Sequence, residues 1–283
     1  MIIIRIFSSF KTTEPLSLIF IRGYELEYDS DFNTKYKFTE GDDYTHVLLL
    51  NTAMPRLNKI NIKNVIGLTF EPSQFLGITN EFINYVNKNV GKYYIDQTYG
   101  KLNSPFYEHF SYLPHTIDLK NIITNKTKIM SIMISQKTDA PGHKYRHILT
   151  NAILRTNLPI DIYGRGCDFY NNINDNRIKG KFRKNEMYND YKFHVCIENF
   201  STPHYFSEKI INPLRCNTTP IYWGCKNIHS YFGDTMIILS GDVSKDIEIL
   251  KQICEKPEKY AKNIDTEIVK KTTNIKNVIN EWL

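Results

Sequence analysis

A dense group of charged and polar residues lies in the second half of the chain. Glu198 and Asn199 come directly after the largely apolar run 193–197, and Glu208 and Lys209 follow at the start of a segment with helical spacing. We expect the run to be a buried strand, and ligands of open α/β sheets bind at the carboxyl ends of strands. The first turn of the next helix would offer free N–H groups and a positive dipole end, which suit a phosphate. The group predicts a site for a phosphorylated ligand.

A purely structural interpretation of the same residues stays open. Ser207 could cap the helix and leave Glu208 and Lys209 as an ion pair in solvent. Under the ligand interpretation, Lys209 supplies a mobile positive charge to the phosphate, and Glu208 accepts hydrogen bonds from sugar hydroxyls.

The spacing of this block resembles the signature of family 10 glycosyltransferases, the α1,3/α1,4-fucosyltransferases, and most of all that of compact bacterial or viral members. Four short segments carry the resemblance, and they are Tyr191 to Phe193, Glu198-Asn199, Tyr205 to Lys209 and Pro220 to Gly224. The resemblance implies a GT-B fold, in which two Rossmann-like domains face each other across a cleft. It also implies an inverting transfer of fucose from GDP-fucose to a hydroxyl of a glycan acceptor, with an α1,3-type linkage expected.

The resemblance assigns donor-binding residues in this block. Asn199, Tyr205, Glu208 and Lys209 would contact the donor, with Lys209 at the diphosphate and Glu208 at hydroxyls of the ribose or the fucose. Glu198, at the end of the predicted strand, belongs to the same predicted set.

Earlier elements of the same half extend the predicted donor site. A helix is expected over 143–155, and Arg146 on it is similar in placement to a family arginine that binds the diphosphate; a guanidinium can make bidentate bonds to phosphate oxygens. Lys144 is the rival, and an exposed Arg146 without a ligand is the structural alternative. The turn that begins with Tyr163 and Gly164 is similar to a family turn near the nucleotide, so both residues join the set.

Glu71, after a predicted strand in the first half, is the candidate catalytic base. It stands in a Phe-Glu-Pro-Ser segment, which is similar to a family block with Ser and Pro exchanged. Inverting transfer needs a carboxylate that deprotonates the acceptor hydroxyl. Asp96 is the nearest acidic rival, Glu81 and Glu108 are weaker candidates, and a solvated carboxylate without a catalytic role is the alternative.

The predicted chemistry requires no cofactor and leaves a divalent cation at most a stimulating role. Arg146 and Lys209 would neutralise the leaving diphosphate, with a stabilisation that grows as the glycosidic bond breaks. The Asp-Ser-Asp segment at 29–31 lies in a polar stretch and not in the nucleotide half. His143 and His147 lie four residues apart but lack the intervening acidic residue of a His-Glu-x-x-His zinc site.

Two alternatives to fucosyl transfer stay open. The same scaffold could transfer another sugar from a different nucleotide donor, or it could be a non-catalytic module that binds a nucleotide sugar or a glycan. A functional base at Glu71 distinguishes an enzyme from such a module.

Length, charge and cysteine content narrow the class of protein further. The chain has 283 residues, 41% of them hydrophobic, and a formal charge of +6, which predicts a globular protein of about two domains without a nucleic-acid partner. No run of about 18 apolar residues occurs, so no transmembrane segment is expected. The five cysteines form no Cys-x-x-Cys pair, which predicts reduced thiols and a cytoplasmic location, in a host cell if the source is viral.

Short apolar runs alternate with helical segments, which predicts βαβ units and parallel sheets. The predicted domains are 1–125 on the acceptor side, 126–264 for the nucleotide sugar, and a C-terminal helix over 265–283 that caps the second domain or crosses back. In the first half we expect strands at 2–7, 46–50, 65–70 and 93–95, a helix at 80–90 and a loop over 98–115. In the second half we expect strands at 129–135, 159–163, 192–198, 219–223 and 236–239 and helices at 143–155, 185–190, 205–215 and 243–254.

Overall fold

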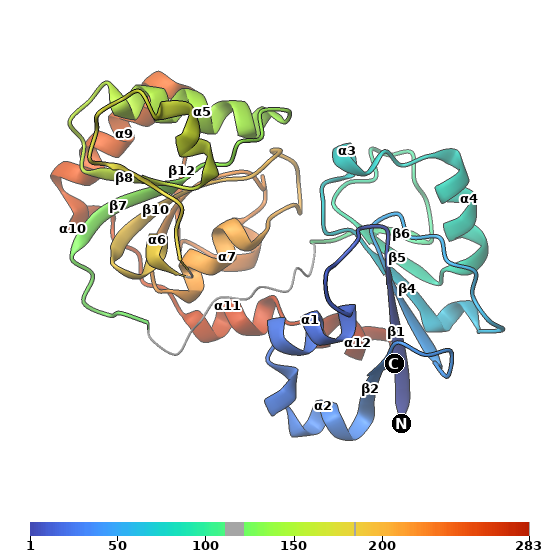
Figure 1. Ribbon diagram of the computed structural model, residues 1–283. Helices are drawn as coiled ribbons and strands as arrows, with labels where there is room; N and C mark the ends of the chain where they lie inside the picture. The colour runs from blue at the N-terminus through green and yellow to red at the C-terminus, as the bar shows by residue number, and fades with distance from the viewer. Residues whose placement is uncertain (111–121, 184, 283) are drawn as a thin grey trace. The chain divides into compact units, whose positions relative to one another are not determined.

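The computed structural model describes residues 1–110, 122–183 and 185–282 (Figure 1). Its contacts divide the chain into two compact units. The first comprises Met1–Thr116, Thr202–Tyr205 and Thr272–Leu283, and the second comprises Ile117–Ser201 and Phe206–Lys271. Each unit contains its own six-stranded parallel sheet with helices packed against it, so the predicted α/β class is confirmed.

The first unit has the strand order β2-β1-β3-β4-β5-β6. Its strands are β1 Ile2–Ser8, β2 Tyr36–Thr39, β3 His46–Leu50, β4 Val65–Leu68, β5 Lys92–Ile95 and β6 Phe106–Glu108. The sequence predicted β1, β3, β4 and β5, because parallel strands buried on both faces are continuous apolar runs. It missed the edge strands β2 and β6, and β6 lies in the predicted loop, of which residues 111–115 fall outside the described residues.

Helices cover both faces of this sheet (Figure 1). They are α1 Leu16–Gly23, α2 Ser30–Lys35, α3 Ser73–Leu76, α4 Asn80–Asn89 and α12 Lys276–Trp282, with 3-10 turns η1 Leu26–Tyr28 and η2 Ile62–Asn64. On one face, α4 buries Phe82 and Val86 in a cluster that includes Tyr93 of β5. Phe20 of α1 packs against Phe38 in a separate aromatic contact.

The predicted single helix over 265–283 is wrong. The segment forms α11 Thr266–Thr272 and α12, and the Asn274 side chain accepts a hydrogen bond from the backbone of Lys276 at 2.9 Å where α12 begins. Such a cap favours a new helix start over a continuous helix. The ammonium of Lys276 lies 2.6 Å from the carboxylate of Asp29, the residue that caps α2, so this ion pair ties α12 to α2 within the first unit. The Asp-Ser-Asp segment therefore takes part in a structural ion pair.

The second unit has the strand order β12-β11-β10-β7-β8-β9. Its strands are β7 Lys128–Met133, β8 Ile160–Tyr163, β9 Ile178–Gly180, β10 Tyr191–Ile197, β11 Thr219–Trp223 and β12 Ile237–Ile238. The chain runs from β7 outward to β9 and then returns to β10 on the other side of β7. The direction of winding reverses between β7 and β10, and ligands of such sheets bind at the carboxyl ends of strands at this point.

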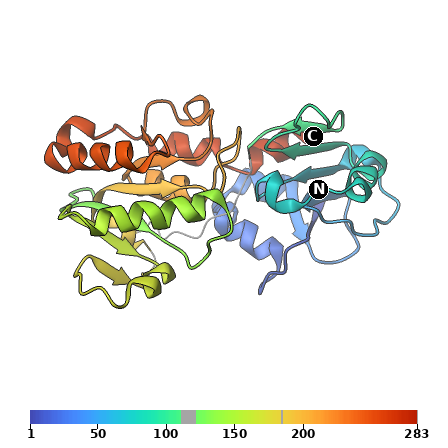
Figure 2. The same cartoon turned by 90° about the horizontal axis from the view of Figure 1, so that it is seen from above.

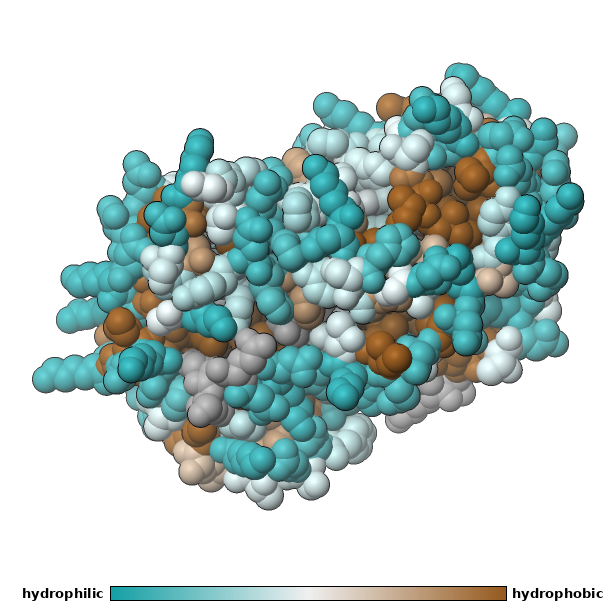
Figure 3. Space-filling model, turned by 180° about the vertical axis from the view of Figure 1, so that it is seen from behind, coloured by the Kyte–Doolittle hydropathy of each residue, from teal (hydrophilic) through white to brown (hydrophobic). Residues whose placement is uncertain are grey.

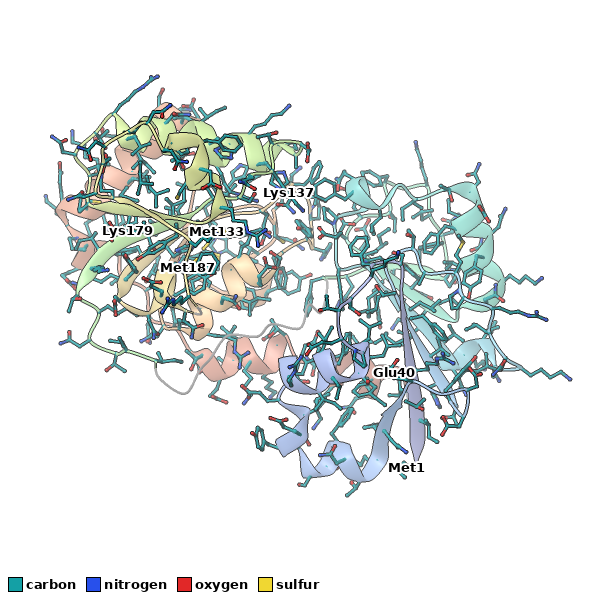
Figure 4. The ribbon with its side chains drawn as sticks, viewed as in Figure 1. Met1, Glu40, Met133, Lys137, Lys179 and Met187 are labelled. Atoms are coloured by element: carbon teal, nitrogen blue, oxygen red, sulfur yellow. The ribbon has the colours of Figure 1, made fainter. Side chains whose placement is uncertain are left out.

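Helices also cover both faces of the second sheet. They are α5 Pro141–Leu154, α6 Glu186–Asn189, α7 Glu208–Arg215, α8 His229–Phe232, α9 Val243–Glu255, α10 Pro257–Tyr260 and α11, with the 3-10 turn η3 Arg165–Tyr170. Figure 2 looks down on α5 and α9, which contact each other and bury Leu149 and Leu250 against the strands. On the other face, Met187 of α6 packs near Met133 of β7 (Figure 4).

Polar side chains dominate the surface seen in Figure 3, where apolar residues form separate patches. Within the described ranges, every helix is too short or too polar to span a membrane. All five cysteines are free thiols, and four of them are buried.

Candidate active site

Glu198 is the first residue after β10, and its side chain is fully buried. Its two carboxylate oxygens accept hydrogen bonds from the backbone N–H and the hydroxyl of Ser207, each at 2.8 Å. Burial raises the pKa of Glu198, and the nearby ammonium of Lys209 opposes this rise. Because both oxygens are occupied by the N-terminus of α7, Glu198 orients that helix. We therefore regard it as a positioning residue.

Lys209 lies in the first turn of α7 with only 14% of its side chain exposed. Its ammonium lies 2.9 Å from the Ser207 hydroxyl, 3.3 Å from Glu208 and 3.4 Å from Glu198. Burial alone would lower the pKa of Lys209, but the carboxylates of Glu208 and Glu198 outweigh it and raise the pKa. Lys209 is therefore charged at neutral pH and held in place, unlike one half of a solvated surface pair.

Arg146 lies on α5 and is almost completely buried, whereas the rival Lys144 is exposed on the same helix. The Arg146 guanidinium donates a hydrogen bond to the side-chain oxygen of Asn199 at 2.7 Å. Its charge is close enough to lower the pKa of Lys209. Two cations from different helices thus meet beside the end of β10, as a diphosphate site requires.

Gly142, which the sequence analysis did not select, brings α5 onto the end of β10. Its backbone N–H donates to the Asn199 carbonyl at 3.0 Å, and a Cβ there would lie 1.7 Å from the Glu198 carbonyl oxygen. Gly224 is similarly constrained, since its Cβ would lie 2.5 Å from Cγ of Glu198. The only hint in the sequence that Gly142 matters was a Pro-Gly pair at the start of a predicted helix. The close approach itself could not be predicted, because it involves the end of β10, more than fifty residues away.

The Gly142→Ala variant tests this close approach. The methyl group cannot fit beside the Glu198 carbonyl without backbone movement, so we expect a loss of about 1–3 kcal/mol in unfolding free energy. Binding of the predicted ligand GDP should weaken as well, because the displaced α5 carries Arg146. Chemical denaturation and calorimetry measure the two effects. Gly41→Ala is the control, since its nearest atom is the flexible carboxylate of Asp43. Equal stability of both variants would contradict the prediction.

The turn after β8 closes over the end of β7. Gly164 has a left-handed φ of 105°, and a Cβ there would lie 2.1 Å from the Ile134 carbonyl oxygen, so this position requires glycine. Tyr163 is buried, with its hydroxyl 2.8 Å from the hydroxyl of Tyr191. The predicted donor contacts of Tyr163 and Gly164 stay predictions, and a contact by Tyr163 would have to come from its backbone.

Tyr205 is also buried, and the segment Thr202–Tyr205 groups with the first unit. Its predicted donor contact stays a prediction.

Two histidines near these residues have partners within the protein. His194 lies 2.7 Å from the Ser131 hydroxyl, and burial lowers the pKa of His194 to about 3. His147 lies 2.9 Å from the Ser135 carbonyl oxygen. Across the described residues, no three His, Cys, Asp or Glu side chains gather as a metal site would need.

In the first unit, Glu71 follows β4 and is partly exposed. The Asn51 side chain accepts hydrogen bonds from the backbone N–H groups of Phe70 and Glu71, at 2.8 and 3.3 Å, which fixes the loop. The rival Asp96 is fully buried and accepts a hydrogen bond from the backbone of Ser73 at 3.1 Å. Burial raises the pKa of Asp96. Accessibility thus favours Glu71 over Asp96 as a base.

The two weaker acidic candidates are placed differently. Glu108 accepts hydrogen bonds from the backbone and hydroxyl of Thr98, at 2.8 and 2.7 Å, and these bonds lower the pKa of Glu108. Glu81 is exposed on the first turn of α4. A base accepts a proton less readily when its carboxylate is already stabilised, which disfavours Glu108.

Residues 123–265 match the model of the C-terminal region of glycosyltransferase family 10, the fucosyltransferases. This match covers half of the chain and includes Arg146, Asn199, Glu208 and Lys209. The chain belongs to glycosyltransferase family 10. The predicted membership is thereby confirmed, and the residues that carried the resemblance lie within the matched region.

Protein R654 of Acanthamoeba polyphaga mimivirus, whose name assigns it to the fucosyltransferases, is 29% identical over 229 residues. The match covers 75% of this chain but 34% of the viral protein, so the chain spans about a third of that relative. The α-(1,3)-fucosyltransferase FucT of Helicobacter pylori is 43% identical over 49 residues, which are 17% of this chain and 10% of FucT.

Solved structures share the fold at low identity. An α1,3-fucosyltransferase with GDP-fucose aligns with a TM-score of 0.56 and 13% identity, over 99% of this chain and 90% of that one. HepE of Anabaena with UDP-glucose aligns with a TM-score of 0.61 and 10% identity, over 99% and 97%. The predicted GT-B fold class is confirmed by these similarities. They do not select a donor, because they include complexes with two different nucleotide sugars.

Proposed function

We propose that this family 10 member transfers fucose from GDP-fucose to a hydroxyl of a glycan acceptor, with inversion and in an α1,3-type linkage. The observation that carries the proposal is the pair of cations beside the end of β10, the buried guanidinium of Arg146 and the partly buried ammonium of Lys209. The family match supports fucose as the sugar, and the names of the α-(1,3)-fucosyltransferase relatives support the linkage.

Arg146 and Lys209 would hold the diphosphate and stabilise the charge that develops as the bond to the sugar breaks. Asn199 would be placed by its hydrogen bond to Arg146. The partly exposed Glu208 could accept hydrogen bonds from hydroxyls of the donor. We propose that these cations make a metal ion unnecessary for transfer.

In the proposed reaction, the acceptor oxygen attacks the anomeric carbon of fucose on the face opposite GDP. A new carbon–oxygen bond forms as the bond to the β-phosphate oxygen breaks, and GDP leaves with the electron pair. The acceptor hydroxyl proton passes to the carboxylate of Glu71. We place the reaction in a reducing compartment such as the cytoplasm, which the free thiols support.

A donor screen by thermal unfolding tests the proposal, because a ligand that binds only the native state raises its apparent stability. GDP-fucose and GDP should raise the melting temperature, whereas UDP-glucose and UDP should not. Release of GDP should then require a glycan acceptor and continue in EDTA. Stabilisation by UDP compounds alone would instead favour the other-donor alternative. Binding of GDP-fucose without transfer to any glycan of a broad panel would favour the binding-module alternative.

A further inference from the structure

A pocket of about 460 Å³ lies within the first unit, between α3, α4 and the loop that follows β5. Small-molecule sites commonly enclose roughly 300–1,000 Å³, so this pocket has room for a compact ligand. None of the predicted donor residues lines it. Ser73, in the lining, is the first residue of α3, and Glu71 lies only two residues before it in the loop that leads into this helix.

Tyr99 is the most unusual residue in the lining. Its backbone has a left-handed φ of 55°, which is rare for a bulky aromatic residue, and the residue as a whole is 49% exposed. The hydroxyl lies 2.9 Å from the Ser73 hydroxyl, which holds the ring at the pocket. Unfavourable backbone conformations persist where the surroundings impose them, and they cluster at ligand-binding sites.

Neighbouring hydrogen bonds hold the walls of the pocket in place. The backbone of Ser73 donates to the buried carboxylate of Asp96 at 3.1 Å. The Gln97 side chain accepts a hydrogen bond from Thr202 at 3.0 Å, and Thr98 donates its N–H and hydroxyl to Glu108. A site whose walls are already ordered loses little entropy when a ligand binds.

The lining combines apolar and polar groups in a way that fits a sugar ring. Ile83 and Leu102 are apolar, the Tyr99 ring offers a flat amphipathic face, and the amides of Asn80 and Gln97 can bond hydroxyls. Of the described residues that line the pocket, Lys101 alone carries a full charge, and it is exposed. A neutral pyranose therefore fits this lining better than a phosphorylated ligand does.

We infer that this pocket binds a neutral sugar ring of the glycan acceptor and that Tyr99 is the stacking platform. That the bound sugar belongs to an acceptor rests on the proposed function. Binding of a sugar in this pocket does not depend on the donor. The pocket would thus contribute to acceptor specificity, independently of the residues that hold the nucleotide.

The Tyr99→Asn variant removes the ring and keeps a residue that tolerates left-handed backbone. We expect its affinity for sugars on an array of neutral mono- and disaccharides, measured without donor, to fall about tenfold or more. Tyr99→Phe should retain most binding. Tyr28→Asn is the matched control, because Tyr28 is exposed in the same unit and does not line the pocket. Stabilisation by GDP-fucose should be unchanged in all three variants.

If Tyr99→Asn fails to fold, Ile83→Trp tests the same site by filling the pocket from α4, and it should also abolish sugar binding. Wild-type protein that binds no sugar on the array overturns the inference, as does a Tyr99→Asn or Ile83→Trp variant that binds sugars normally. Binding that depends on Tyr99 supports the inference even if GDP-fucose does not stabilise the protein, and only the proposed function then fails.

Discussion

Lys209→Met should lower kcat/KM for the proposed fucosyl transfer about 100- to 1,000-fold, the usual effect of removing one group that stabilises developing negative charge. The side chain is held by Ser207, Glu208 and Glu198 and is charged at neutral pH, so its charge is available without rearrangement. Methionine has a similar length but no charge. The variant should also bind GDP more weakly, which calorimetry measures alongside initial rates of GDP release.

Lys144→Met is the matched control for this prediction. Lys144 is exposed on α5, two residues from Arg146, and its loss should leave transfer within about twofold of wild type. The melting temperature of Lys209→Met must also be recorded, because the substitution removes the ammonium that lies 3.4 Å from the buried Glu198 carboxylate. An unchanged GDP affinity and rate in Lys209→Met would remove this residue from the donor site.

Glu71→Gln should reduce the proposed transfer about 100- to 10,000-fold, the effect expected when the proposed general base loses its charge. Glutamine keeps the shape of the side chain, and the backbone bond to Asn51 does not involve the carboxylate. GDP-fucose binding and the melting temperature should therefore stay close to those of wild type. Single-turnover rates with saturating donor and acceptor separate the chemical step from binding.

Asp96→Asn distinguishes the two acidic candidates. Because the buried Asp96 carboxylate accepts a backbone hydrogen bond from Ser73, its replacement should lower stability more than Glu71→Gln does. If Glu71→Gln transfers fucose at the normal rate while folded Asp96→Asn does not, the base assignment moves to Asp96. A pH profile of kcat for both variants would identify the group whose ionisation limits the reaction.

Short-range patterns allowed much of the fold to be predicted. Strands such as β3 and β10 are buried on both faces and hence consist of continuous apolar residues. Helices such as α4 and α9 bury one face only, and so show periodic apolar residues. The edge strands β2, β6 and β9 were missed because they show neither signal: they bury less surface and pair on one side only.

Local spacing along the chain was enough to indicate the family and the residue types between Glu198 and Lys209, because these residues are close neighbours in the sequence. Where these residues lie and what they contact could be learned only from the folded chain. In the folded chain, Glu198 is buried and accepts a hydrogen bond from the N-terminus of α7. Arg146 contacts Asn199 whereas Lys144 is exposed, and position 142 has no room for a side chain larger than that of glycine. Each of these outcomes depends on contacts between segments brought together by the sheet, and side-chain spacing along the chain carries no record of such contacts.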